Sequence, residues 1–184
     1  MKKIIALALA FCMLFALAAC TKSGAGESDE MVTFITEGKM VIGTTATTEP
    51  FTYVGADGAA TGLAIDVANA VAAEMSATPE VVVMASMDEL VKALNDNKID
   101  VIVDVMEKND ENKELARLTS AYYTEGEGDD AISYVFGVKR SKDLLHDAVN
   151  ASLSTVMGVK DEAGLTKYDG IKAKYFPAEE AAAE

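Results

Sequence analysis

Short runs of apolar, β-branched residues alternate with amphipathic segments through the first half of the chain, and this alternation constrains the fold more than any other feature. The apolar runs, at 39–44, 81–85 and 99–105, are typical of buried strands. The segments between them, at 65–75 and 86–94, repeat apolar residues at helical spacing. Strands that alternate with helices across short connections build a parallel sheet with helices on its faces. The sequence therefore predicts an α/β fold with a single doubly wound, mostly parallel sheet.

The second half of the chain continues the pattern with a strand at 132–138 and a last helical stretch at 165–176. Two serines are expected to begin helices. Ser86 is followed three residues later by Glu89, which matches a capping box in which each residue accepts a hydrogen bond from the other's backbone amide. Ser141 precedes an amphipathic stripe and is expected to cap that helix.

The first 20 residues have the layout of a secretory signal. Two lysines precede an apolar run at 4–18, which is short for the roughly 17 to 25 residues of a membrane-spanning helix, the alternative interpretation. Leu17-Ala18-Ala19-Cys20 resembles the lipobox of bacterial lipoproteins, which implies cleavage before Cys20 and a diacylglycerol on its sulfur. We expect a signal peptide at 1–19 and a lipid anchor on Cys20 that holds the protein to the outer side of a cell membrane.

The remaining terminal segments are expected to be flexible. Residues 20–30 are small and polar after the cysteine and are typical of a tether between membrane and domain. Residues 178–184 form an alanine and glutamate tail that is expected to fray. The folded domain is therefore expected at 31–177.

Cysteine usage and charge exclude several functions. Cys12 lies in the discarded apolar run and Cys20 carries the lipid, so the domain holds no thiol for a disulfide or a nucleophile. The formal net charge is −14 with no basic stripe, which argues against nucleic-acid binding. No nucleophile elbow, phosphate-binding glycine loop or metal-ligand motif occurs in the sequence, so we expect no enzyme activity, cofactor or metal.

Several blocks resemble the family 3 solute-binding proteins, the receptors of ABC importers for polar amino acids. The blocks are 38–75, 87–106, the crossover-like Tyr122-Tyr123-Thr124, and the closing segments 138–150 and 167–176. The resemblance implies the type 2 periplasmic-binding-protein fold, an extracytoplasmic location, a small polar solute and an ABC permease as partner.

The resemblance also implies a missing half. Family members have two lobes, and the second is inserted between the crossover and the return strand. Here only 124–131 separates those two segments, too few residues for a domain. We therefore expect one lobe resembling lobe 1, made of 31–124 and 131–177 and joined by a solvent loop at 125–130.

The resemblance places a solute site at the strand ends, where the family grips a carboxylate with an arginine and with hydroxyl groups. Asn112 stands at the arginine position, and Asp104 and Glu107 stand at serine or threonine positions. The candidate solute-binding residues are Thr45, Thr48, Phe51, Asp104, Glu107 and Asn112. Because the two acids repel an anion, we expect an impaired or altered site that retains at most weak binding of a cationic or neutral solute. The alternative is a protein-interaction module that docks a permease or another subunit through the face left by the missing lobe.

Three further features have plain interpretations. The acids at 104–111 could ligate calcium, but they lack the regular spacing of a calcium loop and are expected to be an exposed strand end. Tyr122 and Tyr123 are expected in the core or the crossover rather than stacked on a solute. His146, the only histidine, has no recognisable partner and is expected at the surface.

Overall fold

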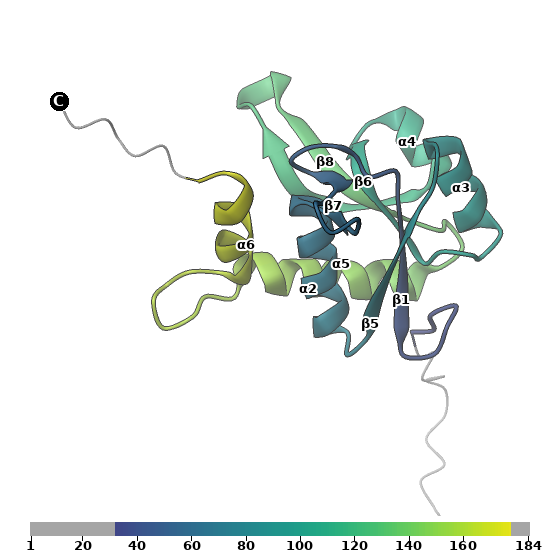
Figure 1. Ribbon diagram of the computed structural model, residues 1–184, viewed down its shortest axis with the longest axis horizontal. Coiled ribbons are helices and arrows are strands. Elements are labelled where there is room, and N and C mark those ends of the chain that lie inside the picture. Colours follow the sequence, from purple (N-terminus) through teal and green to yellow (C-terminus); the bar gives the residue numbers. More distant parts are fainter. Residues whose placement is uncertain (1–31, 178–184) are drawn as a thin grey trace, which may run out of the picture. The chain divides into compact units, whose positions relative to one another are not determined.

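A computed structural model describes residues 32–177 (Figure 1). The predicted signal peptide, Cys20, the tether and the tail at 178–184 lie outside the described residues. Between residues 32 and 177, none of the helices combines the length and apolarity that a membrane span requires.

A five-stranded sheet in the order β5-β1-β6-β8-β7 forms the centre of the domain. Its strands are β1 (Lys39–Thr44), β5 (Thr78–Val83), β6 (Val101–Glu107), β7 (Arg117–Glu125) and β8 (Ile132–Val138). β1 pairs in parallel with β5 and β6, whereas β8 pairs antiparallel with β6 and β7. Every strand except β8 therefore runs in the same direction, which confirms the mostly parallel sheet.

Helices cover both faces of this sheet. They are α2 (Leu63–Glu74), α3 (Met87–Asn95), α4 (Asp110–Leu115), α5 (Asp143–Gly158) and α6 (Lys167–Tyr175). One core packs α2 and α5 against the sheet, and a separate core packs α3 against its other face (Figure 1). β1 serves both cores, because Met40 and Ile42 face α2 while Val41 faces α3. The doubly wound arrangement predicted from the sequence is confirmed.

The approach of α3 to the sheet requires a glycine in β1. A Cβ atom on Gly43 would overlap the side chains of Ile99 and Leu90, which are both fully buried. β1 therefore carries a residue without a side chain at the point where α3 comes closest to the strand.

The segment that connects β1 to α2 along the chain forms a small antiparallel sheet. It consists of β2 (Thr47–Thr48), β3 (Thr52–Val54) and β4 (Ala60–Thr61). The turn from β4 into α2 passes close to Phe51, because Gly62 has a φ of 128° and a Cβ there would overlap the Phe51 carbonyl. This turn fixes the backbone of Phe51 beside the start of α2.

The helix starts agree only in part with the sequence predictions. Ser86 accepts a hydrogen bond from the Glu89 amide at 3.2 Å, but the Glu89 carboxylate accepts from the amide of Ala85, at 3.1 Å, and not from that of Ser86. The prediction for Ser141 is wrong, because Lys142 is the N-cap of α5 and makes no side-chain capping bond.

The β7–β8 hairpin was only partly predicted. The expected loop at 125–130 contains the last residue of β7 and a 3₁₀ turn, η1 (Gly128–Asp130). The first residues of β7, at 117–121, were not predicted as a strand. Tyr122 is fully buried and stacks on Phe136 with ring centroids 4.8 Å apart, so its predicted core position is confirmed.

The prediction for His146 is wrong. The residue is only 7% exposed, because α5 packs along β7 and the imidazole lies between them. Nε2 is 3.0 Å from the Leu118 carbonyl oxygen and Nδ1 is 2.8 Å from the Asp147 carboxylate. Asn150, one turn further along α5, accepts a hydrogen bond from the Ser120 amide at 2.7 Å. Side chains of α5 thus satisfy backbone groups at the outer edge of β7.

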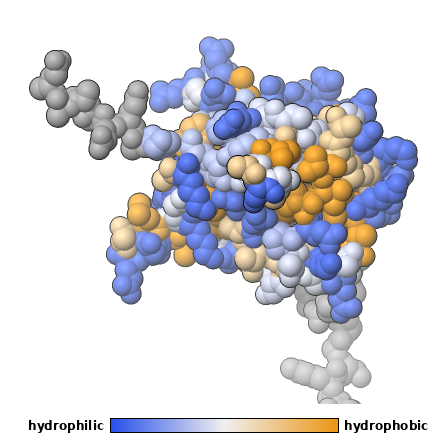
Figure 2. Space-filling view, in the orientation of Figure 1, coloured by the Kyte–Doolittle hydropathy of each residue, from blue (hydrophilic) through white to orange (hydrophobic). Residues whose placement is uncertain are grey.

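The opposite edge of the sheet is β5, which pairs only with β1. Val81 and Val82 are partly exposed, and Val83 is 50% exposed. Figure 2 shows an apolar area on the side of the molecule that carries β5 and α3.

Candidate functional site

The predicted site residues gather at one edge of the sheet, where β1, β6 and β7 end and β8 begins. In open α/β sheets this carboxyl edge is where ligands bind. We call it the strand-end face and define it by Thr45, Thr48, Phe51, Asp104, Glu107, Asn112, Tyr123, Glu125 and Tyr134.

Asp104 is buried, with 4% of its surface exposed, which contradicts the expectation of an exposed acid. One carboxylate oxygen accepts bonds from the Thr45 amide and hydroxyl, both at 2.7 Å. The other accepts from the Thr52 hydroxyl at 3.3 Å and from the Val105 amide at 2.8 Å. Since such bonds contribute about 1.5 to 3 kcal/mol each, Asp104 holds the segment after β1 against β6. Its oxygens are already occupied by the protein's own donors.

Glu107 and Asn112 lie together at the exposed end of β6. The Asn112 side-chain amide donates to the Glu107 carbonyl at 2.8 Å, so it closes the turn between β6 and α4. Asn112 therefore supplies neither the charge nor the fork of donors that an arginine would bring. The Glu107 carboxylate remains exposed, opposite Tyr134 in the register of the sheet.

Thr48 lies at the exposed rim of the small sheet. Its carbonyl accepts a hydrogen bond from the Phe51 amide at 2.9 Å, which forms a tight turn. The Thr45 and Thr47 hydroxyls are 3.0 Å apart beside it. The predicted residues before Phe51 are thus brought together through backbone turns.

Phe51 belongs to an aromatic group that sequence reasoning found only in part. Its ring centroid is 5.0 Å from that of Tyr123 and 5.2 Å from that of Tyr134. Phe176, beyond α6, stacks on Tyr123 with centroids 5.2 Å apart and planes at 12°. The alternation of β8 could have indicated Tyr134, but the place of Phe176 depends on how α6 packs.

Two acids and one lysine set the electrostatics around this aromatic group. The Tyr134 hydroxyl donates a hydrogen bond to the Glu125 carboxylate at 3.1 Å, and desolvation together with this bond raises the tyrosine's pKa. The ammonium of Lys172 already lies over the Tyr123 ring, 5.6 Å from its centroid. Aromatic faces beside the carboxylates of Glu107 and Glu125 attract ammonium or guanidinium groups and repel carboxylates.

The acids at 104–111 do not form a cation cage. Within the described part of the chain, no three His, Cys, Asp or Glu side chains gather as metal ligands. Asp104 points into the protein, whereas Asp110 pairs with Lys113 at 2.7 Å on α4. The expectations that the chain binds no metal and is not an enzyme stay predictions.

Comparison with known proteins identifies the family. Residues 40–178 match the family model of the bacterial extracellular solute-binding proteins, family 3. The chain belongs to this family. The resemblance inferred from the sequence blocks is therefore confirmed, and most of the domain of this family 3 protein lies within the matched region.

Similar proteins place this family 3 chain beside arginine-binding relatives. It is 31% identical over 124 residues to the arginine-binding extracellular protein ArtP of Bacillus subtilis (strain 168). The aligned region covers 67% of this chain and 46% of that protein. The chain thus spans about half the length of this curated relative.

Solved structures give the same fold. A mutant of the arginine-bound form of domain 1 from TmArgBP is 26% identical, with a TM-score of 0.62, over 66% of this chain and 94% of that one. A periplasmic binding protein of Salmonella typhimurium, described by its high arginine specificity, has a TM-score of 0.66 at 18% identity, over 75% of this chain and 99% of that one. The second likeness concerns the fold alone, whereas the first is to a single domain and agrees with the predicted lobe.

Proposed function

We propose that this chain is a lipid-anchored, single-lobe solute-binding protein of an amino-acid ABC import system, with a strand-end face altered to bind the cationic end of its solute. Family membership and the relatives named for arginine support the solute class. The lipobox-like ending at Cys20 supports an anchor outside the cytoplasm, with an ABC permease as partner.

The composition of the strand-end face carries the proposal. Asn112 stands where the family resemblance implies an arginine, and its side chain is bonded to the Glu107 carbonyl at 2.8 Å. Asp104 is saturated by protein donors, so Glu107 and Glu125 are the acids that a solute meets. A cation gains from these carboxylates and from the partly exposed ring of Phe51.

A single lobe is compatible with binding but weakens it. The relative described as the arginine-bound form of domain 1 is a precedent for a solute on one domain. A lone face leaves the solute partly hydrated and without the contacts of a second lobe. If half of the polar contacts are absent, roughly 4 kcal/mol is lost, which is about a thousandfold in affinity compared with a two-lobed receptor.

Titration with agmatine and arginine tests this site, because agmatine keeps the guanidinium of arginine and lacks its carboxylate. We expect the two to bind the full chain within about threefold of each other in calorimetry, and glutamate not to bind. Glu107→Gln should weaken both about tenfold, whereas Glu162→Gln, an exposed acid far along the chain, should not. Preference for arginine over agmatine by more than tenfold, or no heat from either, contradicts the proposal.

The lipid anchor has its own test. Cells that express the chain are fed an alkyne-tagged fatty acid, and the protein is followed in the membrane fraction. Cys20→Ser should abolish labelling and release the protein, while Cys12→Ser leaves both unchanged. Retention of the Cys20→Ser variant in membranes contradicts lipid anchoring.

A second candidate function is docking of another subunit on the strand-end face. Val83, at the end of β5, is 50% exposed, and Ile132, at the start of β8, is 40% exposed. Apolar side chains exposed along one edge favour a protein partner. Ile132→Asn removes the exposed apolar side chain without adding a charge beside Glu125. If this variant loses co-purification with the permease but keeps its agmatine affinity, the result supports the second function over the first.

A further inference from the structure

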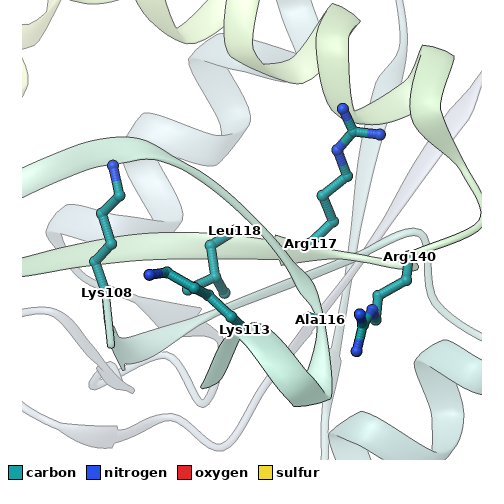
Figure 3. Close-up of a pocket in the computed structure, with 6 residues that line it drawn as sticks. All are labelled: Lys108, Lys113, Ala116, Arg117, Leu118 and Arg140. Carbon is teal, nitrogen blue, oxygen red and sulfur yellow. The ribbon is translucent and has the colours of Figure 1, made fainter. Parts of the chain in front are cut away.

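A cationic pocket lies outside the strand-end face. It is bounded by α4, by the start of β7 and by Arg140, which follows β8. It has a volume of about 370 Å³, within the lower range of small-molecule sites. Its lining residues are Lys108, Lys113, Ala116, Arg117, Leu118 and Arg140 (Figure 3). These include both arginines of a chain whose formal net charge is −14, and no acid is among the described residues that line it.

The basic side chains keep donors available to a ligand. Arg117 directs one terminal nitrogen to Asp143 and the other to Asp147, at 3.6 Å. Its Nε–H group remains available as a donor to a ligand. Arg140 uses one terminal nitrogen for Glu114, at 3.1 Å, and keeps the other. The acids in these ion pairs are largely exposed, so each pair contributes little and yields to a competing anion.

Two lysines complete the cationic rim. Lys113 pairs with Asp110, which is itself almost fully exposed. Lys108 forms no ion pair with any residue between 32 and 177. Lys108 is therefore the group whose charge is least compensated by the protein.

The floor of the pocket is apolar. Leu118 is partly exposed and forms the floor, and it packs on the core that includes the fully buried Ala116. Figure 3 shows the four basic side chains spread around Leu118 instead of meeting at one point. A compact inorganic ion reaches only one or two such groups. An organic anion contacts the rim with its charge and covers the floor with its apolar body.

We propose that this pocket is a second ligand site, which takes an organic carboxylate with an apolar body. The carboxylate accepts hydrogen bonds from Lys108 and Lys113, with Arg117 at the far end of the rim, and the apolar part lies on the partly exposed Leu118. None of these residues belongs to the strand-end face, so the site is independent of the function proposed above.

Benzoate is the probe, and the amide resonances of the full chain in nonionic detergent are the readout. We expect saturable shifts at 108–118 and at Arg140, with acetate, which lacks the apolar ring, binding at least tenfold more weakly. Lys108→Gln with Lys113→Gln should weaken benzoate about tenfold. Lys160→Gln, an exposed lysine outside the pocket, is the matched control and should leave affinity unchanged.

Each other outcome overturns the proposal. It fails if benzoate gives no saturable shifts at these residues, or if the double variant, shown to be folded by its remaining resonances, binds equally well. Equal affinity for inorganic phosphate contradicts the apolar part of the site, and binding of cyclohexylammonium to the same residues contradicts its charge. Agmatine titrations of the double variant should match the parent, so failure here is distinguishable from failure at the strand-end face.

Discussion

The two edges of the sheet are protected in different ways. At β7, side chains of α5 bond to the strand's outward backbone groups, with His146 at the Leu118 carbonyl and Asn150 at the Ser120 amide. Those bonds replace a neighbouring strand and bury the only histidine. Unpaired edge groups are a template for aggregation, and a covering helix removes it.

At β5 the protection lies in the strand itself. The Thr78 amide bonds to Gly38 and the Met84 amide to Thr44, so the alternation of a parallel ladder turns the amides of odd-numbered residues outward. Pro79 has no N–H at one of these positions, and Glu80 is an exposed acid on the same strand. The comparison teaches that one edge depends on tertiary contacts, whereas the other depends on local sequence.

The largest effect is expected from His146→Ala. The change removes a buried ring and leaves the Leu118 carbonyl without its partner, so we expect the free energy of unfolding to fall by about 2 to 3 kcal/mol in urea denaturation. His146→Phe keeps a buried ring but removes the hydrogen bonds, so it separates the contribution of ring burial from that of the bonds. A loss below about 0.5 kcal/mol would show that α5 does not protect this edge.

Asn150→Ala should have a smaller effect, of about 1 kcal/mol, because it leaves the Ser120 amide unpaired at a more exposed place. Asn150→Asp keeps an acceptor for this amide and is the matched control in the same urea experiment. The Asn150 amide also lies 3.3 Å from His146 Nε2, so the double variant with His146→Ala should depart from additivity. Strict additivity would contradict a shared network.

Asp147 reports the same network through its titration. The hydrogen bond with His146 is the main cause that lowers the pKa of this carboxyl from its ordinary value of 3.8. A depressed pKa in the folded state stabilises the protein above pH 3.8, and that contribution is lost as the pH falls through the folded value. In His146→Ala the midpoint should rise toward 3.8, as measured by carbon NMR of the carboxyl group. An unchanged midpoint would assign the shift to Arg117 instead.

The smallest effect is expected at the other edge. Val83→Lys on β5 changes an exposed side chain and breaks no bond, so unfolding should change by less than about 0.5 kcal/mol. Thr78→Lys, also exposed on β5, serves as the control. A loss comparable to that of His146→Ala would show that the β5 edge also depends on tertiary contacts.

The same division explains what the sequence could predict. The strands at 39–44 and 132–138 follow from local apolar patterns, and both were placed correctly. The strand at 117–121 was missed because its edge residues mix polar and apolar types and its outer bonds come from α5. His146 was misplaced for the same reason, since its partners are distant in sequence.

The sequence predicted which residues gather at the strand-end face, but not how they are bonded there. The family resemblance predicted residues that the structure brings together at one edge of the sheet, because their placement depends on the order of the strands. It did not reveal that Asp104 is buried, since the threonines that bond to it, Thr45 and Thr52, are brought near by the fold. Phe176 joined the aromatic group through the packing of α6, which no local pattern encodes.

The anchoring of Thr45 and Thr52 to Asp104 has a kinetic consequence. It sets the segment that carries Phe51 in place before any solute arrives, so little conformational freedom is lost on association. Under the single-lobe function proposed above, a face that is set in advance and is not covered by a second lobe would exchange its solute rapidly in both directions. On that proposal, the protein would raise the local concentration of a solute near the membrane, with short residence times, rather than store it.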